Sequence, residues 1–475
     1  MNDRRLLVLD DDPTGSQCVA GVDIALTDDP DVPAHALHDP GSVCFVLTNS
    51  RALDESAAVG VNRRIVGGVL DRLPAGTPVH VVSRSDSTLR GHVIAEPNAI
   101  ADELAAHGIE VDGFLLCPAM IEAGRSTADD VHRAVVDGEA VPVALTDFAA
   151  DATFGYHNSN LREFIEERSS GAVRADDVLS ISLTDIRDGG PDRVEKILRD
   201  AHDRRWVVVN ATEYADMDVV AEALRRRESE GRVFVSRCAP SFVRSLAGQK
   251  DAALLDDDDL RTAPGRLRGG LVVVGSHVGL TTAQLAVVQE RSGALEVALH
   301  VPTLLDPDPH VGQAHIAAAA QRIREHLADG DCVLYTSRDL VRTQDRDESL
   351  AIARRVSDAV VAVVQAVRDA RPAWVIAKGG ITSHEVAASG LGIRRAEVVG
   401  QFFPGQISMF RADVAPADVL GMPYVVFPGN VGGTTALADV IERMRAAANR
   451  HSTANSHSTE HGEQPCTAPN DGGQH

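Results

Sequence analysis

The stretch LLVLDDDPTG, residues 6–15, joins an apolar run to three consecutive aspartates. The apolar run predicts a buried strand, and the proline after the aspartates predicts a turn that ends it. Asp10, Asp11 and Asp12 repel one another, so their position at a strand end needs a physical reason. They either cap the turn before Pro13 or bind a ligand, and the rest of the chain must decide between these two interpretations.

Short β-branched runs of the same kind recur along the chain and alternate with helical patterns. This alternation predicts an α/β fold built on mostly parallel sheets. One helical pattern, residues 63–73, places apolar side chains on one face, as a core-facing helix requires. These side chains are Ile65, Val66, Val69, Leu70 and Leu73. The candidate strands are residues 5–9, 43–48, 79–83, 113–117, 178–183, 206–210, 232–236, 271–275, 332–337, 373–377 and 424–427.

The polar stretch 247–270 divides this series in two. It contains proline, glycine and a run of four aspartates, which is typical of a linker, and 475 residues exceed what one hydrophobic core usually holds. We therefore expect an N-terminal domain over residues 1–246 and a C-terminal domain over 271–448, followed by a disordered polar tail, 449–475. Each domain is expected to be a mostly parallel sheet flanked by helices, with the active site in the cleft between them.

Composition and charge exclude several classes of protein. The formal net charge of -23 argues against nucleic acid as a partner, because phosphates would be repelled. No run of 18 apolar residues is present, and the first residues do not read as a signal peptide, so no membrane partner is expected. The 6 cysteines are scattered without zinc-binding spacing, which indicates a reducing compartment. The sequence therefore predicts a cytoplasmic protein.

Three predicted strands of the second domain run into the same kind of junction, in which glycines precede hydroxyl residues at a helix start. The junctions lie at residues 275–276, 379–382 and 429–435. Glycine lets backbone amides approach a ligand, and the helix start behind it favours an anion. One such junction equally describes a capped helix, but three in one domain indicate phosphate groups and hence a nucleotide. Neither the P-loop nor the dinucleotide fingerprint is present.

Charged and hydroxyl side chains gather at the strand ends of the first domain. Arg51 follows the strand 43–48, and Arg125 follows the strand 113–117. The strand 79–83 is followed by RSDSTLRGH, which holds Arg84, Ser85, Asp86 and Arg90. Arginines suit a carboxylate or phosphate, whereas aspartates accept hydrogen bonds from sugar-like hydroxyls. The alternative is an ion-pair network in which the arginines only neutralise the aspartates. An acidic, hydroxylated ligand in one domain and a nucleotide in the other together describe a sugar-acid kinase.

The motifs of the first domain resemble those of the four-carbon acid sugar kinase family. Its D-D-x-T-G segment is matched by residues 11–15, its K-x-D-S-T-x-R-G segment by 84–91, and its P-A-x-x-x-x-G-R-x-T segment by 118–127. The resemblance extends to about residue 446. It implies ATP-dependent phosphorylation of the terminal hydroxyl of threonate, erythronate, 3-oxo-tetronate or a branched 3-oxo analogue.

The second domain matches the ATP-binding segments of the same family with some departures. The segments G-S, G-G-[DE]-T and K-S-G-N-F-G correspond to residues 275–276, 379–382 and 427–432. Ile381 replaces an acidic residue, and Phe427 and Pro428 replace a lysine and a serine. In the first domain Arg84 stands where lysine is usual, which keeps the charge but changes its geometry.

The residues and the resemblance together assign expected roles. Asp86 is the expected catalytic base, because neighbouring arginines should keep it ionised, and Asp12 is the second candidate. Arg90 and Arg125, assisted by Arg51 or Arg84, are expected to bind the substrate carboxylate. The expected substrate-binding residues are Asp11, Asp12, Arg51, Arg84, Ser85, Arg90 and Arg125, and the expected ATP-binding residues are Ser276, Gly379, Gly380, Ile381, Thr382, Gly429, Asn430 and Gly432.

The expected partners are therefore a small sugar acid and ATP, with magnesium entering on the ATP and no dedicated metal-binding residues. A homodimer is one candidate assembly. Two other functions stay open from the sequence: a nucleotide-linked dehydrogenase, which would share the α/β domains, and a non-catalytic sugar-acid sensor, which would keep the arginines.

Overall fold

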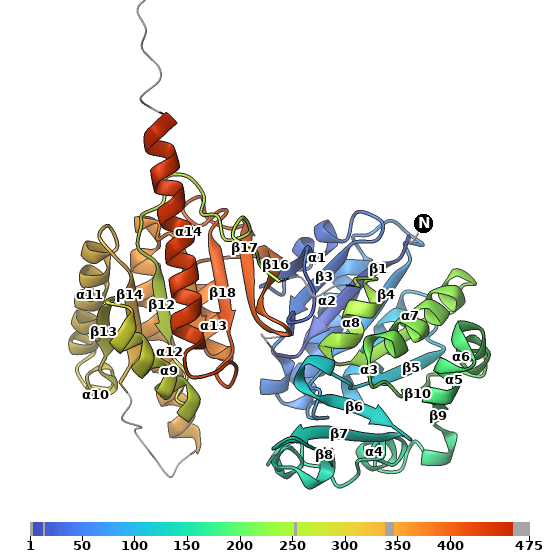
Figure 1. Ribbon diagram of the computed structural model, residues 1–475. Helices are drawn as coiled ribbons and strands as arrows, with labels where there is room; N and C mark the ends of the chain where they lie inside the picture. The colour runs from blue at the N-terminus through green and yellow to red at the C-terminus, as the bar shows by residue number, and fades with distance from the viewer. Residues whose placement is uncertain (1–2, 13–14, 251–253, 338–345, 459–475) are drawn as a thin grey trace, which may run out of the picture.

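The computed structural model describes residues 3–12, 15–250, 254–337 and 346–458, and it confirms a two-domain α/β fold. A single 15-stranded sheet runs through both halves of the molecule (Figure 1). Its order is β13-β14-β12-β15-β18-β17-β16-β2-β3-β1-β4-β11-β5-β10-β9. The sequence predicted a separate sheet in each domain, and the structure instead joins them edge to edge.

The N-terminal half is a parallel sheet whose strands are buried on both faces. Alternate residues of β1 (Arg5–Asp10) enter two different cores. Leu6 and Val8 pack on the side of α7 (Tyr214–Ser229), whereas Leu7 and Leu9 pack on the side of α2 (Glu55–Leu70) and α3 (Ala95–Ala106). This double burial explains why the strands read as continuous aliphatic runs. The other parallel strands of this half are β2 (Val22–Ala25), β3 (Val43–Leu47), β4 (Val79–Arg84), β5 (Gly113–Cys117), β9 (Leu179–Ile181), β10 (Arg205–Val209) and β11 (Phe234–Cys238).

The C-terminal half repeats this arrangement with five parallel strands. These are β12 (Leu271–Val274), β13 (Leu295–Leu299), β14 (Cys332–Thr336), β15 (Val375–Lys378) and β18 (Pro423–Phe427). One face is covered by α9 (Gly279–Arg291) and α14 (Ala436–Ser458), and the other by α11 (Pro309–His326) and α12 (Arg346–Val367). Within the described residues, no helix is both long and apolar enough to cross a bilayer.

The hairpin of β16 (Arg395–Phe403) and β17 (Gln406–Val414) joins the two halves. β16 pairs antiparallel with β2 of the N-terminal half, and β17 pairs antiparallel with β18 of the C-terminal half. The register between the two hairpin strands shifts between Arg395 and Ala396 and again between Val398 and Gly400. Gly405 in the turn has a φ of 64° and contacts Glu122 of the N-terminal half, so the turn also touches the first domain.

Several segments differ from the sequence-based expectations. A small antiparallel sheet of β6 (Arg125–Ala128), β7 (Val131–Val136) and β8 (Glu139–Pro142) was not predicted. Part of the expected linker packs on the protein, since Leu255 and Leu260 are buried. Helix α14 continues to Ser458, so the first ten residues of the expected tail are helical, and residues 459–475 lie outside the described chain. The helix expected over 63–73 forms within α2, although Leu73 lies beyond its end.

Candidate active site

The three aspartates follow β1 and are held by arginines from neighbouring strand ends. The register of β1 and β4 pairs Asp10 with Arg84. The Arg84 Nη1 atom lies 2.8 Å from Asp10 Oδ1 and 3.2 Å from Asp11 Oδ1. Arg51, which follows β3, places Nη2 at 2.6 Å from Asp11 Oδ1 and Nη1 at 3.2 Å from Asp12 Oδ2. All three aspartates therefore form ion pairs with arginines; Asp10 and Asp11 are 0% and 1% exposed, whereas Asp12 is half-buried.

Asp10 is the most deeply buried of the three carboxyl groups. Its Oδ1 atom accepts a hydrogen bond from the Asp12 N–H at 3.3 Å and so closes the turn, as the sequence predicted. Burial raises the pKa of Asp10 to about 7, even though Arg84 opposes the shift. Gly15 packs directly on this carboxyl group, where a Cβ atom would overlap it, which explains the glycine at this position. Pro13 and Thr14 lie outside the described residues.

Asp86 lies in the loop after β4 and accepts hydrogen bonds from two members of its own motif. Arg90 Nε donates to Asp86 Oδ2 at 2.7 Å, and Thr88 Oγ1 donates to the same oxygen. Burial alone would raise the pKa of Asp86, but the charges of Arg51 and Arg90 outweigh burial and hold the pKa well below its usual range. Asp86 is therefore ionised at neutral pH, as the sequence analysis expected.

The loop that carries Asp86 is fixed from outside by neighbouring segments. The Tyr156 hydroxyl donates to Thr88 O at 2.8 Å, and His132 Nε2 lies 2.8 Å from Ser87 O. Ser85 is buried, and its N–H donates to Cys238 O at 2.8 Å. The loop is thus held in one conformation before any ligand arrives, which reduces the entropic cost of binding.

Arg125 differs from the other predicted arginines. Its Nη1 atom donates to Ser87 Oγ at 2.7 Å, and its guanidinium lies over the Phe148 ring at 5.4 Å. Across the described chain it forms no ion pair, whereas Arg90 pairs with Asp86 and lies 3.7 Å from Asp151. Burial lowers the pKa of Arg125, although Asp86 opposes the shift, and the group stays cationic at neutral pH. Arg125 is the predicted arginine with a charge left for an external anion.

Arg237 and its partner Glu96 support this site and were not identified from the sequence. Arg237 is fully buried in β11, where it contacts Glu96 and donates to Ser83 Oγ at 2.7 Å. Its Nη2 atom has no hydrogen bond among the described residues and lies 3.9 Å from Asp11 Oδ2. The available clue was an arginine directly after the predicted strand 232–236, which the structure extends to Cys238. Arg237 adds a third cation near the aspartates.

The three glycine junctions of the C-terminal half meet at one edge of the sheet, because they follow the adjacent strands β12, β15 and β18. Gly275 lies against the Thr382 side chain, and Ser276 Oγ lies 2.8 Å from where a Cβ atom of Gly429 would stand. Thr281 Oγ1 donates to Gly429 O at 2.9 Å, which ties the first junction to the third. Gly379, with a φ of 122°, occupies the middle junction beside Ser276.

The other residues predicted to bind ATP lie in the same three loops. Gly380 is half-buried in the middle junction, Asn430 is exposed in the last, and Gly432 has a φ of 82°. Ile381 is 64% exposed, so the residue that replaces an acidic one in the family pattern leaves most of an apolar side chain accessible to solvent.

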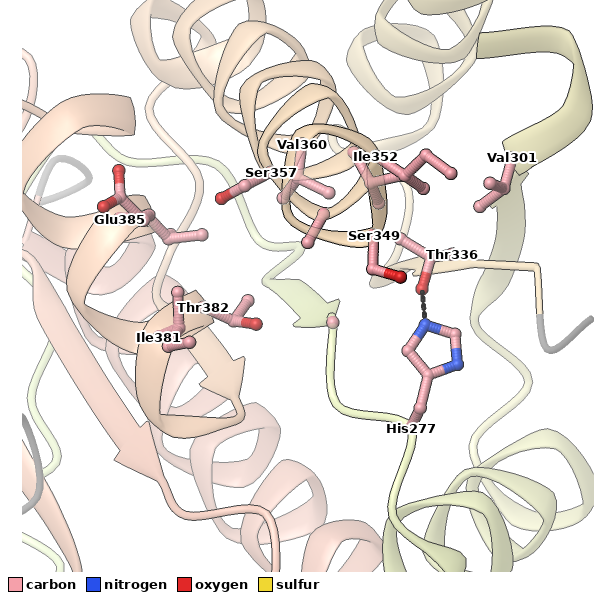
Figure 2. A pocket seen from close by; sticks show the side chains of 14 residues that line it. His277, Val301, Thr336, Ser349, Ile352, Ser357, Val360, Ile381, Thr382 and Glu385 are labelled. Atoms are coloured by element: carbon pink, nitrogen blue, oxygen red, sulfur yellow. Dashed lines mark hydrogen bonds between the residues drawn. The ribbon is translucent and has the colours of Figure 1, made fainter. Parts of the chain in front are cut away.

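A cavity of about 310 Å³ opens beside these junctions (Figure 2). Helix α12 supplies one wall with Ile352 and Val360, and the segment after β15 supplies another with Ile381 and Thr382. The polar groups at its edge are His277, Thr336, Ser349, Ser357 and Glu385, and His277 Nε2 lies 3.1 Å from Thr336 Oγ1. A mostly apolar slot with a few polar groups is typical of a small-molecule site.

The two halves of the chain match known domain families. Residues 6–246 match the description "Sugar-binding N-terminal domain", and residues 271–437 match "Nucleotide-binding C-terminal domain". The fold and its loops thus define a protein that couples a sugar-binding domain to a nucleotide-binding domain. The chain belongs to the four-carbon acid sugar kinase family, whose architecture these domains form, and the resemblance drawn from the motifs is confirmed.

Individual relatives are more distant. A D-erythronate kinase from Heliobacterium modesticaldum (strain ATCC 51547 / Ice1) is 25% identical over 291 residues, which is 60% of this chain and 59% of that protein. The match thus spans less than two thirds of the relative's length. Solved structures from Salmonella typhimurium LT2 and of Haemophilus influenzae protein HI1011 have TM-scores of 0.68 and 0.63, each at 16% identity. They cover 94% and 93% of this chain and 99% of their own chains, and they show the shared fold.

The raised pKa of Asp10 predicts a pH-dependent contribution to stability. Because the folded-state pKa lies above the ordinary value of 3.8, Asp10 stabilises the fold most below about pH 4, and this contribution is lost as the pH rises through about 7. Asp10→Asn removes the titrating group. The Tm of this variant should therefore rise relative to wild type by several degrees between pH 4 and pH 7.5, measured by thermal unfolding.

Asp147→Asn, at an exposed carboxylate of the N-terminal half, is the control and should keep a constant Tm difference from wild type over the same range. An Asp10→Asn difference that is equally constant would show that Asp10 does not titrate in this window.

Proposed function

We propose that this protein is an ATP-dependent kinase that phosphorylates the terminal hydroxyl of a small sugar acid, such as erythronate, threonate, 3-oxo-tetronate or a branched 3-oxo analogue. The observation that carries the proposal is an ionised Asp86 near Arg125, a half-buried cation that forms no ion pair in the described chain. A carboxylate that accepts from a hydroxyl, next to a cation that binds an acid group, is the recognition chemistry of a sugar acid. The relative named D-erythronate kinase supports this substrate class.

Arg125 and Arg90 are proposed to bind the substrate carboxylate. Both guanidinium groups lie over the Phe148 ring, Arg125 at 5.4 Å and Arg90 at 5.6 Å, so one aromatic side chain orients both cations. Asp12 is half-buried and is proposed to accept hydrogen bonds from the hydroxyls of the substrate. Arg51 and Arg84 act indirectly, because they neutralise the aspartates behind this surface.

Asp86 is proposed to orient the attacking hydroxyl and to accept its proton. A carboxylate with a lowered pKa is a weak base, so orientation is its larger contribution early in the reaction. In phosphoryl transfer the hydroxyl loses its proton as bond formation to phosphorus proceeds, and the proton then passes to Asp86. If Arg90 turns toward the substrate carboxylate, its hydrogen bond to Asp86 weakens and the pKa of Asp86 rises, which makes Asp86 a stronger base.

The nucleotide is proposed to bind in the C-terminal half. The apolar cavity beside α12 would take the base, and the three glycine junctions would bind the phosphates through backbone N–H groups. Magnesium would enter on the phosphates, because Asp10, Asp11 and Asp86 are paired with arginines and the described residues hold no group of three or more His, Cys, Asp or Glu side chains that could bind a metal. The ion would neutralise phosphate charge during transfer. Phosphoryl transfer requires this site to approach the sugar-acid site, and the expected cleft between the domains stays a prediction.

The direct test is ADP release by the purified protein with a panel of four- and five-carbon sugar acids, including 3-oxo and branched forms. We expect release with at least one acid, dependence on added MgCl2, and complete loss with EDTA. Oxidation or reduction of NAD(P) with the same acids would instead indicate a dehydrogenase. Acid binding without ADP release under any of these conditions would indicate a sensor.

Replacing Arg125 tests the carboxylate site. Arg125→Lys keeps the charge but loses the paired geometry of the guanidinium, and such charge-assisted bonds contribute about 1.5 to 3 kcal/mol. The KM for the sugar acid should rise about tenfold or more, while the KM for ATP should stay within about twofold. Steady-state kinetics with each substrate varied in turn gives both values. Arg133→Lys, a half-buried arginine on the adjacent strand β7, should change neither KM.

Replacing Asp86 tests the proposed proton acceptor. Asp86→Asn keeps the size and most hydrogen bonds but cannot take the proton, so kcat should fall about 100-fold or more. Binding of the sugar acid, measured by calorimetry, should change far less than kcat. A normal kcat with only a raised KM would assign Asp86 to substrate positioning and move the base to Asp12.

A further inference from the structure

Lys378 is a buried cation in the nucleotide-binding half that the motif comparison did not select. It is the last residue of β15 and is fully buried. Its Nζ atom lies 2.6 Å from Pro428 O, 3.2 Å from Gly429 O and 4.0 Å from the centre of the Phe427 ring. In the described part of the chain no carboxylate pairs with it. Burial lowers the pKa of Lys378 to about 7, which shows that a charged lysine at this position is unfavourable for the free energy of folding.

The position of this lysine follows from the register of two strands. Lys378 of β15 pairs directly with Phe427 of β18. Position 427 is where the family segment carries a lysine and this chain carries phenylalanine. The charge that is absent at position 427 is therefore present one strand away, and it reaches the same loop.

The contacts of Lys378 determine which way this loop faces. In a trans peptide the C=O and the following N–H point in opposite directions. Because Pro428 O and Gly429 O point at the ammonium, the N–H groups of Gly429 and Asn430 point away from it. No acceptor for either N–H is found among the described residues.

Two uncharged side chains, Gln284 and Thr281, also donate hydrogen bonds to carbonyl groups of this loop. Gln284 Nε2 donates to Val431 O at 3.0 Å and to Gly433 O at 2.8 Å, and Thr281 Oγ1 donates to Gly429 O. The loop thus turns its carbonyl groups toward the protein and leaves N–H groups on its other side. Successive outward N–H groups form a concave anion-binding site, and a cation behind them strengthens it.

We propose that Lys378 is a positioning residue for phosphate binding: it holds the loop 428–430 with its N–H groups directed at the nucleotide phosphates and supplies positive charge beneath them. This role deepens the proposed kinase function and rests on its nucleotide site. It also accounts for the tolerance of phenylalanine at position 427, because the charge beneath the loop comes from β15.

The test separates phosphate binding from base binding. ADP and adenosine are titrated into wild type, Lys378→Met and Lys378→Gln by calorimetry at pH 6.5, without any sugar acid. We expect both variants to bind ADP about tenfold or more weakly, since each loses a charge, and to bind adenosine within about twofold of wild type. Lys378→Met should fold, because a flexible apolar side chain of similar length replaces a buried charge. Lys250→Met, at an exposed lysine, is the matched control and should leave both affinities unchanged.

Each other result counts against this role. Unchanged ADP affinity in Lys378→Met would overturn it, and so would a wild type that binds neither ligand or that binds ADP no more tightly than adenosine. An equal loss of ADP and adenosine binding would show a collapsed pocket and would also overturn it. Restoration of ADP affinity by Lys378→Gln would show that hydrogen bonding alone holds the loop and would overturn the charge component. A wild type that binds ADP as expected but releases none with any sugar acid would refute the kinase and leave the role of Lys378 intact.

Discussion

The contact of the Arg84 guanidinium with Asp10 and Asp11 is the interaction on which the substrate side of this molecule depends. Three carboxylates at the end of a buried strand would repel one another strongly in a low dielectric. The parallel register of β1 and β4 brings Arg84 level with Asp10, and Arg51 closes the arrangement from the next strand end. In this arrangement Asp10 and Asp11 are buried and paired with arginines, whereas Asp12 is half-buried, and ligand binding by Asp11 and Asp12 stays a prediction.

The same physical device recurs in both halves. In each, a cation at the end of a parallel strand is buried beneath a loop and determines what that loop presents. Arg84 lies behind the aspartate turn, and Lys378 lies behind the loop after β18. Burial makes both charges costly, and partners that are fixed before a ligand binds offset that cost. Rigid loops of this kind favour ligand binding because little conformational entropy remains to be lost.

The sequence predicted the parallel strands well, because their aliphatic side chains have one role, burial in the core. Every predicted strand has a counterpart, because aliphatic runs of that length are buried on both faces of a parallel sheet. β16 and β17 escaped prediction, since polar residues such as Glu397 and Arg411 interrupt their apolar pattern. The sequence predicted that the glycine junctions lie together, because each follows a strand of one parallel sheet. The partners of Arg51, Arg84 and Lys378 could not be predicted, because they depend on strand register, which a single sequence does not encode locally.

The hairpin between the halves also has a consequence for synthesis on the ribosome. β2 pairs with β3 on one side and with β16 on the other, and β16 emerges about 370 residues later, about 20 to 75 s at bacterial or eukaryotic elongation rates. Throughout that interval the nascent N-terminal half carries an open strand edge, which is a template for pairing with other chains. The molecule is therefore most exposed to aggregation until about the last sixth of the chain is translated, when β16 covers this edge.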